Sequence, residues 1–409
     1  MINIYQKYLS LLAELECYNQ DKIPLCAAET YVSPFVKNAL KSDFEGKYCM
    51  QNKNYEEIKD FVGSGYIHRL YELLEDECKN VFDCSYADAR TLSGMNCISI
   101  AINAFIPRGK RILLTTPRQG GHPSVPLLLD LAQIKYDEIP YDYSNFDIDY
   151  PLLNDLLKGD EYYAVIFAQS DIISPADISK INANSKLIIY DATQTLGMIA
   201  TGVHRNPLND YDNLALIGGT HKTLPGPTSG LVLLKNKDFI NKIDNLISPS
   251  FLRNTQPNNI AGVLLALLEQ EQFGYEYQTK VIANSNYLGK KLEELGFQLA
   301  KTRDHNYTNT HQLFLLTDKF QMGNIVKHGH KFGITLNKKE KDVFRGAGIR
   351  LGLQEITRYG WSDSELDLVA RLIHEISFEQ PNISLINEIK AVLTSKKVNA
   401  YCFDDGIIK

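Results

Sequence analysis

The spacing of hydrophobic residues divides the chain into helical and β-rich stretches. Over the first twenty residues, one face of a predicted helix carries the apolar side chains Tyr8, Leu11, Leu12 and Leu15. A second helix is predicted from Gly65 into the 70s, and a third over residues 97–105. The first part of the chain is therefore expected to be mainly helical.

The middle of the chain contains short apolar runs that are continuous and do not alternate with polar residues: 111–115, 163–167, 186–190, 214–217 and 230–234. Such runs are typical of strands buried on both faces, as in a parallel sheet covered by helices. Helical spacing returns over 262–272 and 280–295, and a mixed pattern follows. We predict an α/β protein with an N-terminal helical arm (1–23), a large domain (24–270) and a smaller C-terminal α+β domain (271–409).

Composition narrows the class of protein. The 409 residues include 43 Lys and Arg against 49 Asp and Glu, a net charge of -6, which argues against a nucleic-acid binder. No apolar run approaches the ~20 residues that cross a bilayer, and the N-terminus lacks the pattern of a signal peptide. Seven cysteines without a C-x-x-C pair indicate neither a disulfide scaffold nor a zinc cluster. We expect a cytoplasmic enzyme without a metal, a membrane partner or a nucleic-acid partner.

Polar residues follow the predicted strands at the edge where parallel sheets bind ligands. Each lies at or just beyond the end of a strand: His122 in Gly120-Gly121-His122, Ser170, Asp191, and Lys222 in Thr220-His221-Lys222-Thr223. Pyridoxal phosphate requires such a set, because it needs a lysine for the Schiff base and an acid against its pyridine nitrogen. Ser93-Gly94, before the helix at 97–105, could supply backbone N–H groups for the phosphate.

Each of these residues also has an ordinary interpretation. A strand-end aspartate is commonly a turn residue, a loop lysine is usually solvated, and Ser-Gly before a helix is commonly a plain N-cap. His122 could be a satisfied structural histidine. The order and spacing of the set together favour the cofactor.

These segments resemble the serine hydroxymethyltransferase family of fold-type I pyridoxal-phosphate enzymes over most of the chain. Thr220-His221-Lys222-Thr223-Leu224-Pro225-Gly226-Pro227 is nearly the family's T-H-K-T-L-x-G-P. Further similar segments, in the family's order, are Ala28-Glu29-Thr30-Tyr31-Val32-Ser33-Pro34, Gly46-Lys47-Tyr48, Ser93-Gly94-Met95-Asn96, Gly120-Gly121-His122, Asp191-Ala192-Thr193-Gln194, residues 199–207 and Gly348-Ile349-Arg350-Leu351-Gly352. The resemblance implies a mostly parallel, seven-stranded sheet in the large domain.

The resemblance also implies roles for matching residues. Lys222 would bind the cofactor as an internal aldimine, and Asp191 would pair with the pyridine nitrogen. The remaining cofactor contacts would come from His122 on the ring, Ser170 at the phenolic oxygen, and a set around the phosphate and ring edge: Ser93, Gly94, Met95, Gln194 and His221. Arg350 would clamp the substrate carboxylate, since a planar guanidinium binds it bidentately. Tyr48 would reach the cofactor and substrate of the neighbouring subunit, which implies a homodimer.

The departures from the family concern the reaction more than the fold. Met50 stands where the family has a glutamate tied to proton transfer and folate chemistry, and a thioether cannot move that proton. Glu56 and Glu57 could replace it only through a rerouted loop. The other changes are Phe61-Val62-Gly63-Ser64 for Y-Y-G-G, Ala28 for a carboxylate-binding serine, Gln194 for a histidine, Met95 for a serine, and Leu252-Arg253-Asn254-Thr255 for Q-G-G-P. Arg253 would then meet a phosphate or an acidic substrate at the dimer interface, or is a surface arginine.

The leading hypothesis is a folate-independent aldolase or transaldolase that cleaves the Cα–Cβ bond of a β-hydroxy amino acid through a glycine quinonoid. His122 and Thr220 are the candidates for removing the β-hydroxyl proton. The alternatives are a tetrahydrofolate-dependent hydroxymethyltransferase and a different pyridoxal-phosphate reaction, namely transamination, decarboxylation or Cα substitution, because a fold does not fix the reaction. A catalytically silent partner subunit is a further alternative, which the retention of Lys222, Asp191 and Arg350 opposes.

Overall fold

The computed structural model describes residues 2–49 and 62–403. Its largest element is a seven-stranded sheet in the order β2-β10-β9-β8-β7-β3-β4. The strands are β2 (Tyr86–Asp88), β3 (Arg111–Leu114), β4 (Lys135–Glu138), β7 (Ala164–Phe167), β8 (Leu187–Asp191), β9 (Leu214–His221) and β10 (Pro225–Leu234). Neighbouring strands are parallel except at β10, which is antiparallel to both β2 and β9. The predicted α/β fold with a mostly parallel sheet is confirmed.

Alternate side chains of these strands enter separate apolar clusters on the two faces of the sheet. In β8, Ile188 and Tyr190 pack on one face, while Leu187 and Ile189 pack on the other. This alternation follows from the two-residue period of a strand. The five strands that the sequence predicted (β3, β7, β8, β9 and β10) are largely apolar because both of their faces are buried. The edge strands β2 and β4 were not predicted, and β4 contains no buried residue.

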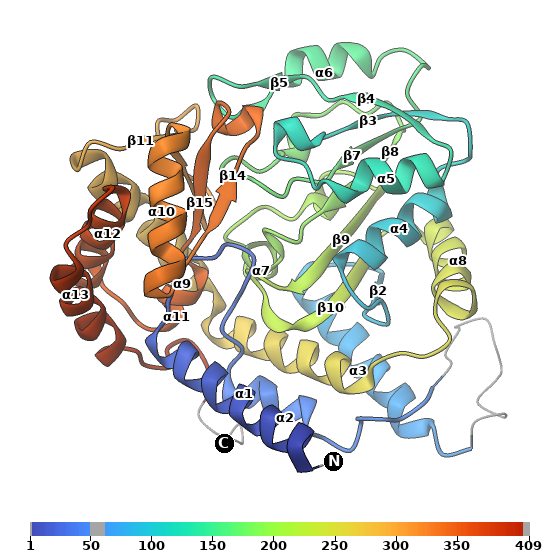
Figure 1. Cartoon of the computed structure of the whole chain (residues 1–409). Coiled ribbons are helices and arrows are strands. Elements are labelled where there is room, and N and C mark those ends of the chain that lie inside the picture. The colour runs from blue at the N-terminus through green and yellow to red at the C-terminus, as the bar shows by residue number, and fades with distance from the viewer. Residues whose placement is uncertain (1, 50–61, 404–409) are drawn as a thin grey trace.

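Helices cover both faces of this sheet (Figure 1). One face packs against α2 (Pro34–Leu40), α3 (Gly65–Phe82) and the start of α9 (Pro257–Glu294); the other packs against α4 (Gly94–Phe105), α5 (Ser124–Leu131) and α8 (Lys237–Asn245). The shorter elements of this part are α6 (Tyr150–Leu156), α7 (Leu196–Ala200) and the hairpin β5 (Tyr141–Asp142) and β6 (Asp147–Ile148).

The C-terminal part has its own sheet and core. Its four strands have the order β11-β12-β15-β14, with bounds β11 (Gln298–Leu299), β12 (Gln312–Leu316), β14 (Asn337–Lys339) and β15 (Gly348–Gly352). The helices α10 (Lys319–Phe332), α11 (Gln354–Arg358), α12 (Asp363–Ser377) and α13 (Ile383–Ser395) pack around it. A short parallel pair, β1 (Ile23–Pro24) with β13 (Ile334–Thr335), connects the N-terminal segment to this part.

The helix α9 corrects one feature of the sequence prediction. The apolar pattern predicted separate helices over 262–272 and 280–295, but α9 is continuous for 38 residues. Gly274 lies in its middle, where a Cβ would come within 2.4 Å of Thr201 Cγ2. The glycine therefore serves a close helix contact and does not break the helix. Residue 270, the predicted domain boundary, falls inside this helix.

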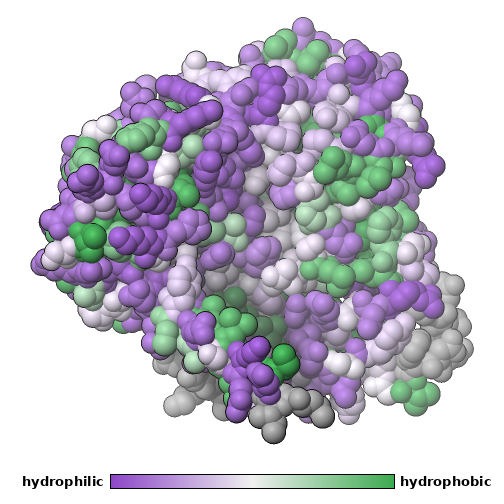
Figure 2. All heavy atoms as spheres, viewed as in Figure 1, coloured by the Kyte–Doolittle hydropathy of each residue, from purple (hydrophilic) through white to green (hydrophobic). Residues whose placement is uncertain are grey.

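The helix α1 (Ile2–Asp21) lies at the surface as an arm (Figure 1). All of its residues from 3 to 21 are exposed, including Leu11 and Leu15. Its C-terminal end is anchored by Lys397, whose Nζ donates to the carbonyls of Asn19 and Gln20. Figure 2 shows hydrophobic residues at the surface in the lower part of the view, where α1 lies, and on the right, over α5.

Among the described residues, no helix has the length and apolar composition needed to span a membrane.

Candidate active site

A cavity of about 220 Å³ opens at the carboxyl ends of β7, β8 and β9. Its lining brings together most of the residues that the sequence singled out: Ser93, Gly94, Met95, His122, Gln169, Ser170, Asp191, Thr193, Gln194, His221 and Lys222. They come from five separate segments of the chain. The topology of the parallel sheet is what makes them neighbours, since each segment follows a strand or begins a helix at this edge.

Asp191 is the last residue of β8 and places a half-buried carboxylate in the cavity. Its Oδ1 accepts hydrogen bonds from the Thr193 backbone N–H at 2.9 Å and from Thr193 Oγ1 at 2.5 Å. Burial raises the pKa of Asp191, against the effect of these hydrogen bonds. Both bonds use Oδ1, so Oδ2 is the oxygen that can receive an N–H from a ligand.

Lys222 follows β9 in a turn whose flanks are fixed. Thr220 Oγ1 donates to Pro227 O at 2.6 Å, and Gln278 Nε2 donates to Thr223 O at 2.8 Å. Burial, reinforced by the charge of Arg350, lowers the pKa of Lys222 to about 8, although Asp191 acts in the opposite direction. A larger fraction of this amine is therefore neutral at physiological pH than for an ordinary lysine, as nucleophilic attack on an aldehyde requires.

The N-terminus of α4 forms the opposite wall. Ser93 caps the helix by accepting a hydrogen bond from Asn96 N at 3.2 Å. A Cβ on Gly94 would lie 2.9 Å from both Gly219 N and Thr193 Oγ1, so only glycine allows this close approach to β9. The first N–H groups of a helix attract anions, and here they line the cavity.

The ring of His221 indicates which kind of ligand fits the cavity beside the N-terminus of α4. Its Nδ1 is buried and has no hydrogen-bond partner in the part of the chain that the structure describes. Burial and the neighbouring Lys222 lower the pKa of His221 to about 4. A buried polar atom without a partner is costly, and a phosphate group could satisfy it from this cavity.

His122, Ser170 and Gln194 complete the lining. The His122 backbone N–H donates to Ala168 O at 2.9 Å, and its ring Nδ1 accepts from Ser124 N at 3.3 Å. Burial lowers the pKa of His122, so the ring is neutral and presents a flat apolar face. Gln194 Oε1 accepts from Gln312 Nε2 at 2.9 Å.

Arg350 lies beside this cavity on β15. Its Nη1 donates to Ser170 O at 2.9 Å and to Asp171 Oδ1 at 2.8 Å. Its Nε and Nη2 both donate to Asn337 Oδ1. The guanidinium is thus held next to Ser170, which lines the cavity, although Arg350 itself is not part of the lining.

Some predicted residues lie elsewhere in this chain. Thr220 is buried behind Lys222, and its hydroxyl is used by Pro227 O, so it anchors the lysine and does not line the cavity. Tyr48 and Arg253 are exposed and are not part of the lining within one chain. Ala28 is half-buried, and the residue before it, Ala27, packs against Gly352 at the end of β15. Met50, Glu56, Glu57 and Phe61 fall outside the described residues.

The structure adds site residues that the sequence did not reveal. Thr193 orients Asp191, and its Oγ1 also accepts from Gly219 N at 2.8 Å. Asp171, Lys339 and Lys341 form an ion cluster with Arg350. One feature of the sequence could have indicated the two lysines. They are two residues apart, which places both side chains on one side of an extended segment.

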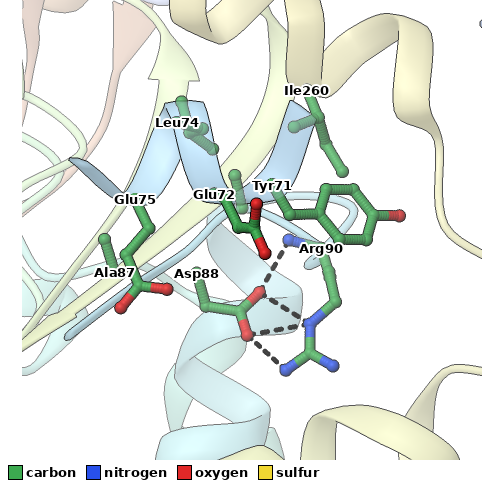
Figure 3. A pocket seen from close by; sticks show the side chains of 9 residues that line it. Tyr71, Glu72, Leu74, Glu75, Ala87, Asp88, Arg90 and Ile260 are labelled. Atoms are coloured by element: carbon green, nitrogen blue, oxygen red, sulfur yellow. Dashed lines mark hydrogen bonds and ion pairs between the residues drawn. The ribbon is translucent and has the colours of Figure 1, made fainter. Parts of the chain in front are cut away.

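A second cavity, of about 30 Å³, holds no more than a water molecule (Figure 3). Arg90 crosses it and pairs with Asp88 and with Asp244. Tyr86 Oη also donates to Asp88 Oδ2 at 2.7 Å. Arg90 is thus bound by two buried carboxylates of the protein itself, and this cavity belongs to a structural ion network.

The larger cavity meets the requirements of one cofactor. It combines a lysine whose pKa is lowered, a half-buried carboxylate with an available oxygen, and a helix N-terminus with an unsatisfied histidine nitrogen beside it. These features define a pyridoxal-phosphate enzyme, in which Lys222, Asp191 and the Ser93–Gly94 wall would hold the aldehyde, the ring nitrogen and the phosphate.

Comparison with known proteins identifies the family. The family model described as serine hydroxymethyltransferase matches residues 6–373, and the chain belongs to this family. Serine hydroxymethyltransferase of Pyrobaculum aerophilum is 28% identical, over 87% of this chain and 85% of that protein. Serine hydroxymethyltransferase of Methanobrevibacter smithii is 27% identical, over 97% of this chain and 95% of that protein.

The fold also matches a solved structure. L-threonine transaldolase from Pseudomonas fluorescens, crystallised in its internal aldimine state, superposes with a TM-score of 0.89 at 24% identity. The match covers 99% of this chain and 96% of that one. The predicted family and fold are confirmed, and the protein is a pyridoxal-phosphate-dependent enzyme.

Proposed function

We propose that the protein cleaves or forms the Cα–Cβ bond of a β-hydroxy amino acid without tetrahydrofolate. The main observation behind this proposal is the number of acidic side chains that line the cavity. Asp191 is the one acidic residue among the described residues that line it, and its position suits the cofactor's ring nitrogen. In sequence, Met50 replaces the glutamate that the family uses in folate-linked proton transfer.

Each residue of the site has a separate role in this proposal. When bound, pyridoxal phosphate supplies an electron sink that weakens the bonds at Cα of an amino acid. Lys222, whose lowered pKa increases the fraction of neutral amine, attaches the cofactor, and Arg350 orients the substrate by its carboxylate. The neutral ring of His122 covers the cofactor and is the remaining candidate for receiving the β-hydroxyl proton, because the Thr220 hydroxyl is already used by Pro227 O.

A tetrahydrofolate-dependent hydroxymethyltransferase is the second candidate, since the relatives with matching sequences carry that name. The fold is shared with an L-threonine transaldolase, so an aldol-type reaction is compatible with it. The discriminating experiment follows aldehyde release from L-threonine and L-serine, with and without tetrahydrofolate. Release from threonine without folate supports the proposal. Cleavage of serine that requires folate contradicts it, and the Lys222→Ala variant serves as the inactive control.

We also propose that the enzyme is a homodimer with Tyr48 and Arg253 serving the partner's site. Both residues are exposed and outside the cavity of their own chain. The exposed arm α1, with eight large apolar residues from Ile4 to Tyr18 at 37% exposure or more, is suited to packing on a second copy.

A cytoplasmic location stays a prediction from the sequence.

A further inference from the structure

The carboxylate of Asp171 is surrounded by three cations. Lys339 Nζ lies 2.7 Å from Oδ1, Lys341 Nζ lies 2.6 Å from Oδ2, and Arg350 Nη1 lies 2.8 Å from Oδ1. The Asp171 side chain is fully buried, and the three cationic side chains are 5% to 19% exposed. One negative charge therefore faces three positive charges in a largely dry environment.

The alternation of an extended strand creates this arrangement. Asn337, Lys339 and Lys341 lie on the inner side of the segment, while Lys338 and Glu340 are exposed. The acids next in sequence do not face the cluster. Glu340 pairs with Lys338, and Asp342 pairs with Arg118, at the surface.

The cluster borders the cavity described above. Lys341 Nζ donates to Gly121 O at 3.3 Å, next to His122, and Arg350 donates to Ser170 O. The charges of Arg350 and Lys339 both act on Lys222. An anion bound in the cavity would therefore be close to the surplus positive charge.

Unbalanced buried charge is unfavourable unless a ligand compensates it. One cation would be enough to compensate Asp171, so two of the three positive charges exceed what a structural ion pair needs. The α-carboxylate of an amino acid bound at Arg350 would offset one of the two surplus charges. One positive charge would remain, which suits a second carboxylate better than a phosphate of charge near -2.

We propose that the substrate carries a second carboxylate, on the side-chain part of the molecule, which Lys339 and Lys341 bind. This inference rests on the proposed function, because it identifies the group attached to Cβ. With 3-hydroxyaspartate, the Cα–Cβ bond breaks and its electron pair stays at Cα. The β-hydroxyl loses its proton as the new C=O forms, glyoxylate leaves, and protonation of Cα gives glycine.

Binding of L-aspartate and L-asparagine to the holoenzyme is the direct test, since the two have the same shape and differ in one charge. Neither carries a β-hydroxyl, so calorimetry reports Kd without retro-aldol cleavage. We expect aspartate to bind about tenfold more tightly or better. Lys339→Met and Lys341→Met should remove this preference, and Lys338→Met, on the outer side of the same strand, should keep it. Lys339→Gln replaces Lys339→Met if the latter fails to fold, which the visible absorbance of the bound cofactor reports.

Equal affinity for aspartate and asparagine in the unaltered enzyme would overturn the inference, as would a preference that survives both lysine substitutions. Cleavage assays with L-threonine and with 3-hydroxyaspartate of the same configuration separate this inference from the proposed function. If threonine is cleaved and 3-hydroxyaspartate is not, the proposed function stands and the second carboxylate is rejected. If neither is cleaved while the aspartate preference depends on Lys339, the reaction is rejected and the binding site is supported.

Discussion

Arg350 and Asp171 form a buried ion pair, with 2.8 Å between Nη1 and Oδ1, at the edge of the cofactor cavity. A substrate carboxylate that binds Arg350 has to compete with this contact. Lys339 holds Oδ1 and Lys341 holds Oδ2 of the same aspartate. Asp171 therefore stays compensated when the guanidinium turns towards a ligand, and it acts as a positioning residue for Arg350.

Asp171→Asn should impair substrate binding more than turnover. Without the carboxylate, Arg350 keeps its contacts to Ser170 O and Asn337 Oδ1 but loses its counter-charge, and three cations repel one another. KM for the amino acid should therefore rise about tenfold with a smaller change in kcat. Stability should fall by on the order of 3 kcal/mol. Steady-state kinetics and urea unfolding measure the two effects, and Asp342→Asn, in an exposed ion pair, is the matched control. An unchanged KM would contradict the positioning role.

The pH dependence of stability tests the same carboxylate. Burial raises the pKa of Asp171, but the charges of Arg350 and the two lysines outweigh it and lower the pKa below the ordinary value. A depressed carboxyl pKa stabilises the fold above the unfolded-state value of about 3.9, and this contribution is lost as the pH falls through the folded-state pKa. The stability difference between the unaltered enzyme and Asp171→Asn should therefore shrink below about pH 4.

Lys222→Ala should abolish the visible absorbance of the lysine-linked cofactor and the activity with it. The side chain is the one lysine among the described residues that line the cavity. Absorption spectra of the purified variant after dialysis against pyridoxal phosphate are the measurement. Lys237→Ala, at an exposed position on α8, should leave the spectrum unchanged. Retained absorbance in Lys222→Ala would reject this lysine as the attachment point.

The rate of cofactor attachment should depend on pH through Lys222. Only the neutral amine attacks an aldehyde, and burial lowers its pKa from 10.5 to about 8. This shift increases the neutral fraction at pH 7 about 300-fold. Stopped-flow mixing of cofactor-free enzyme with pyridoxal phosphate should give rates that rise with pH and level off above about pH 8. Rates that keep rising to pH 10 would contradict the shifted pKa.

The sequence predicted five of the seven strands of the large sheet because both of their faces are buried, and it missed the edge strands β2 and β4. Residues such as Ile188 and Ile189 are apolar in succession, which separates them from a half-exposed strand. The lengths of β9 and β10 were underestimated. Gly218 and Gly219 belong to β9, where Gly219 lies close to Gly94 of α4 and Gly218 close to Thr193, and Pro225 is the first residue of β10.

Most residues that line the cavity were singled out in the sequence because they lie next to a recognisable strand end or within a family motif. The ion cluster was not predicted, because Asp171 and Lys339 are far apart in sequence and meet only when the C-terminal sheet packs on the large domain. Lys-Lys-Glu-Lys over 338–341 has the composition of a solvated surface run. Tertiary contacts, and not the local sequence pattern, determine which of these residues face inward.

Charged substitutions on α1 should separate dimerisation from folding. Leu11 and Leu15 are 62% and 50% exposed in the single chain, so Leu11→Glu and Leu15→Glu should change monomer stability by less than about 0.5 kcal/mol. If the arm packs on a second copy, the same changes bury charge at the interface and weaken it. Analytical ultracentrifugation over a range of concentrations should show a raised dimer dissociation constant. A monomeric unaltered enzyme would contradict the proposed assembly.

Arg358→Met should be among the most destabilising single substitutions outside the cofactor cavity. Arg358 and Glu269 are fully buried and pair over 3.1 Å, and Ser33 Oγ donates to the same carboxylate at 2.7 Å. Removing the arginine leaves a buried carboxylate without its counter-charge, at a cost of about 3–5 kcal/mol in urea unfolding.

The double variant Arg358→Met/Glu269→Gln should recover part of this loss, because no charge is then left unpaired. Arg205→Met removes an arginine that is 67% exposed from its pair with Asp210, and it should cost less than about 1 kcal/mol. If Arg358→Met were as mild as Arg205→Met, the buried pair would not contribute to stability. The position of α11 against α9 would then depend on apolar packing alone.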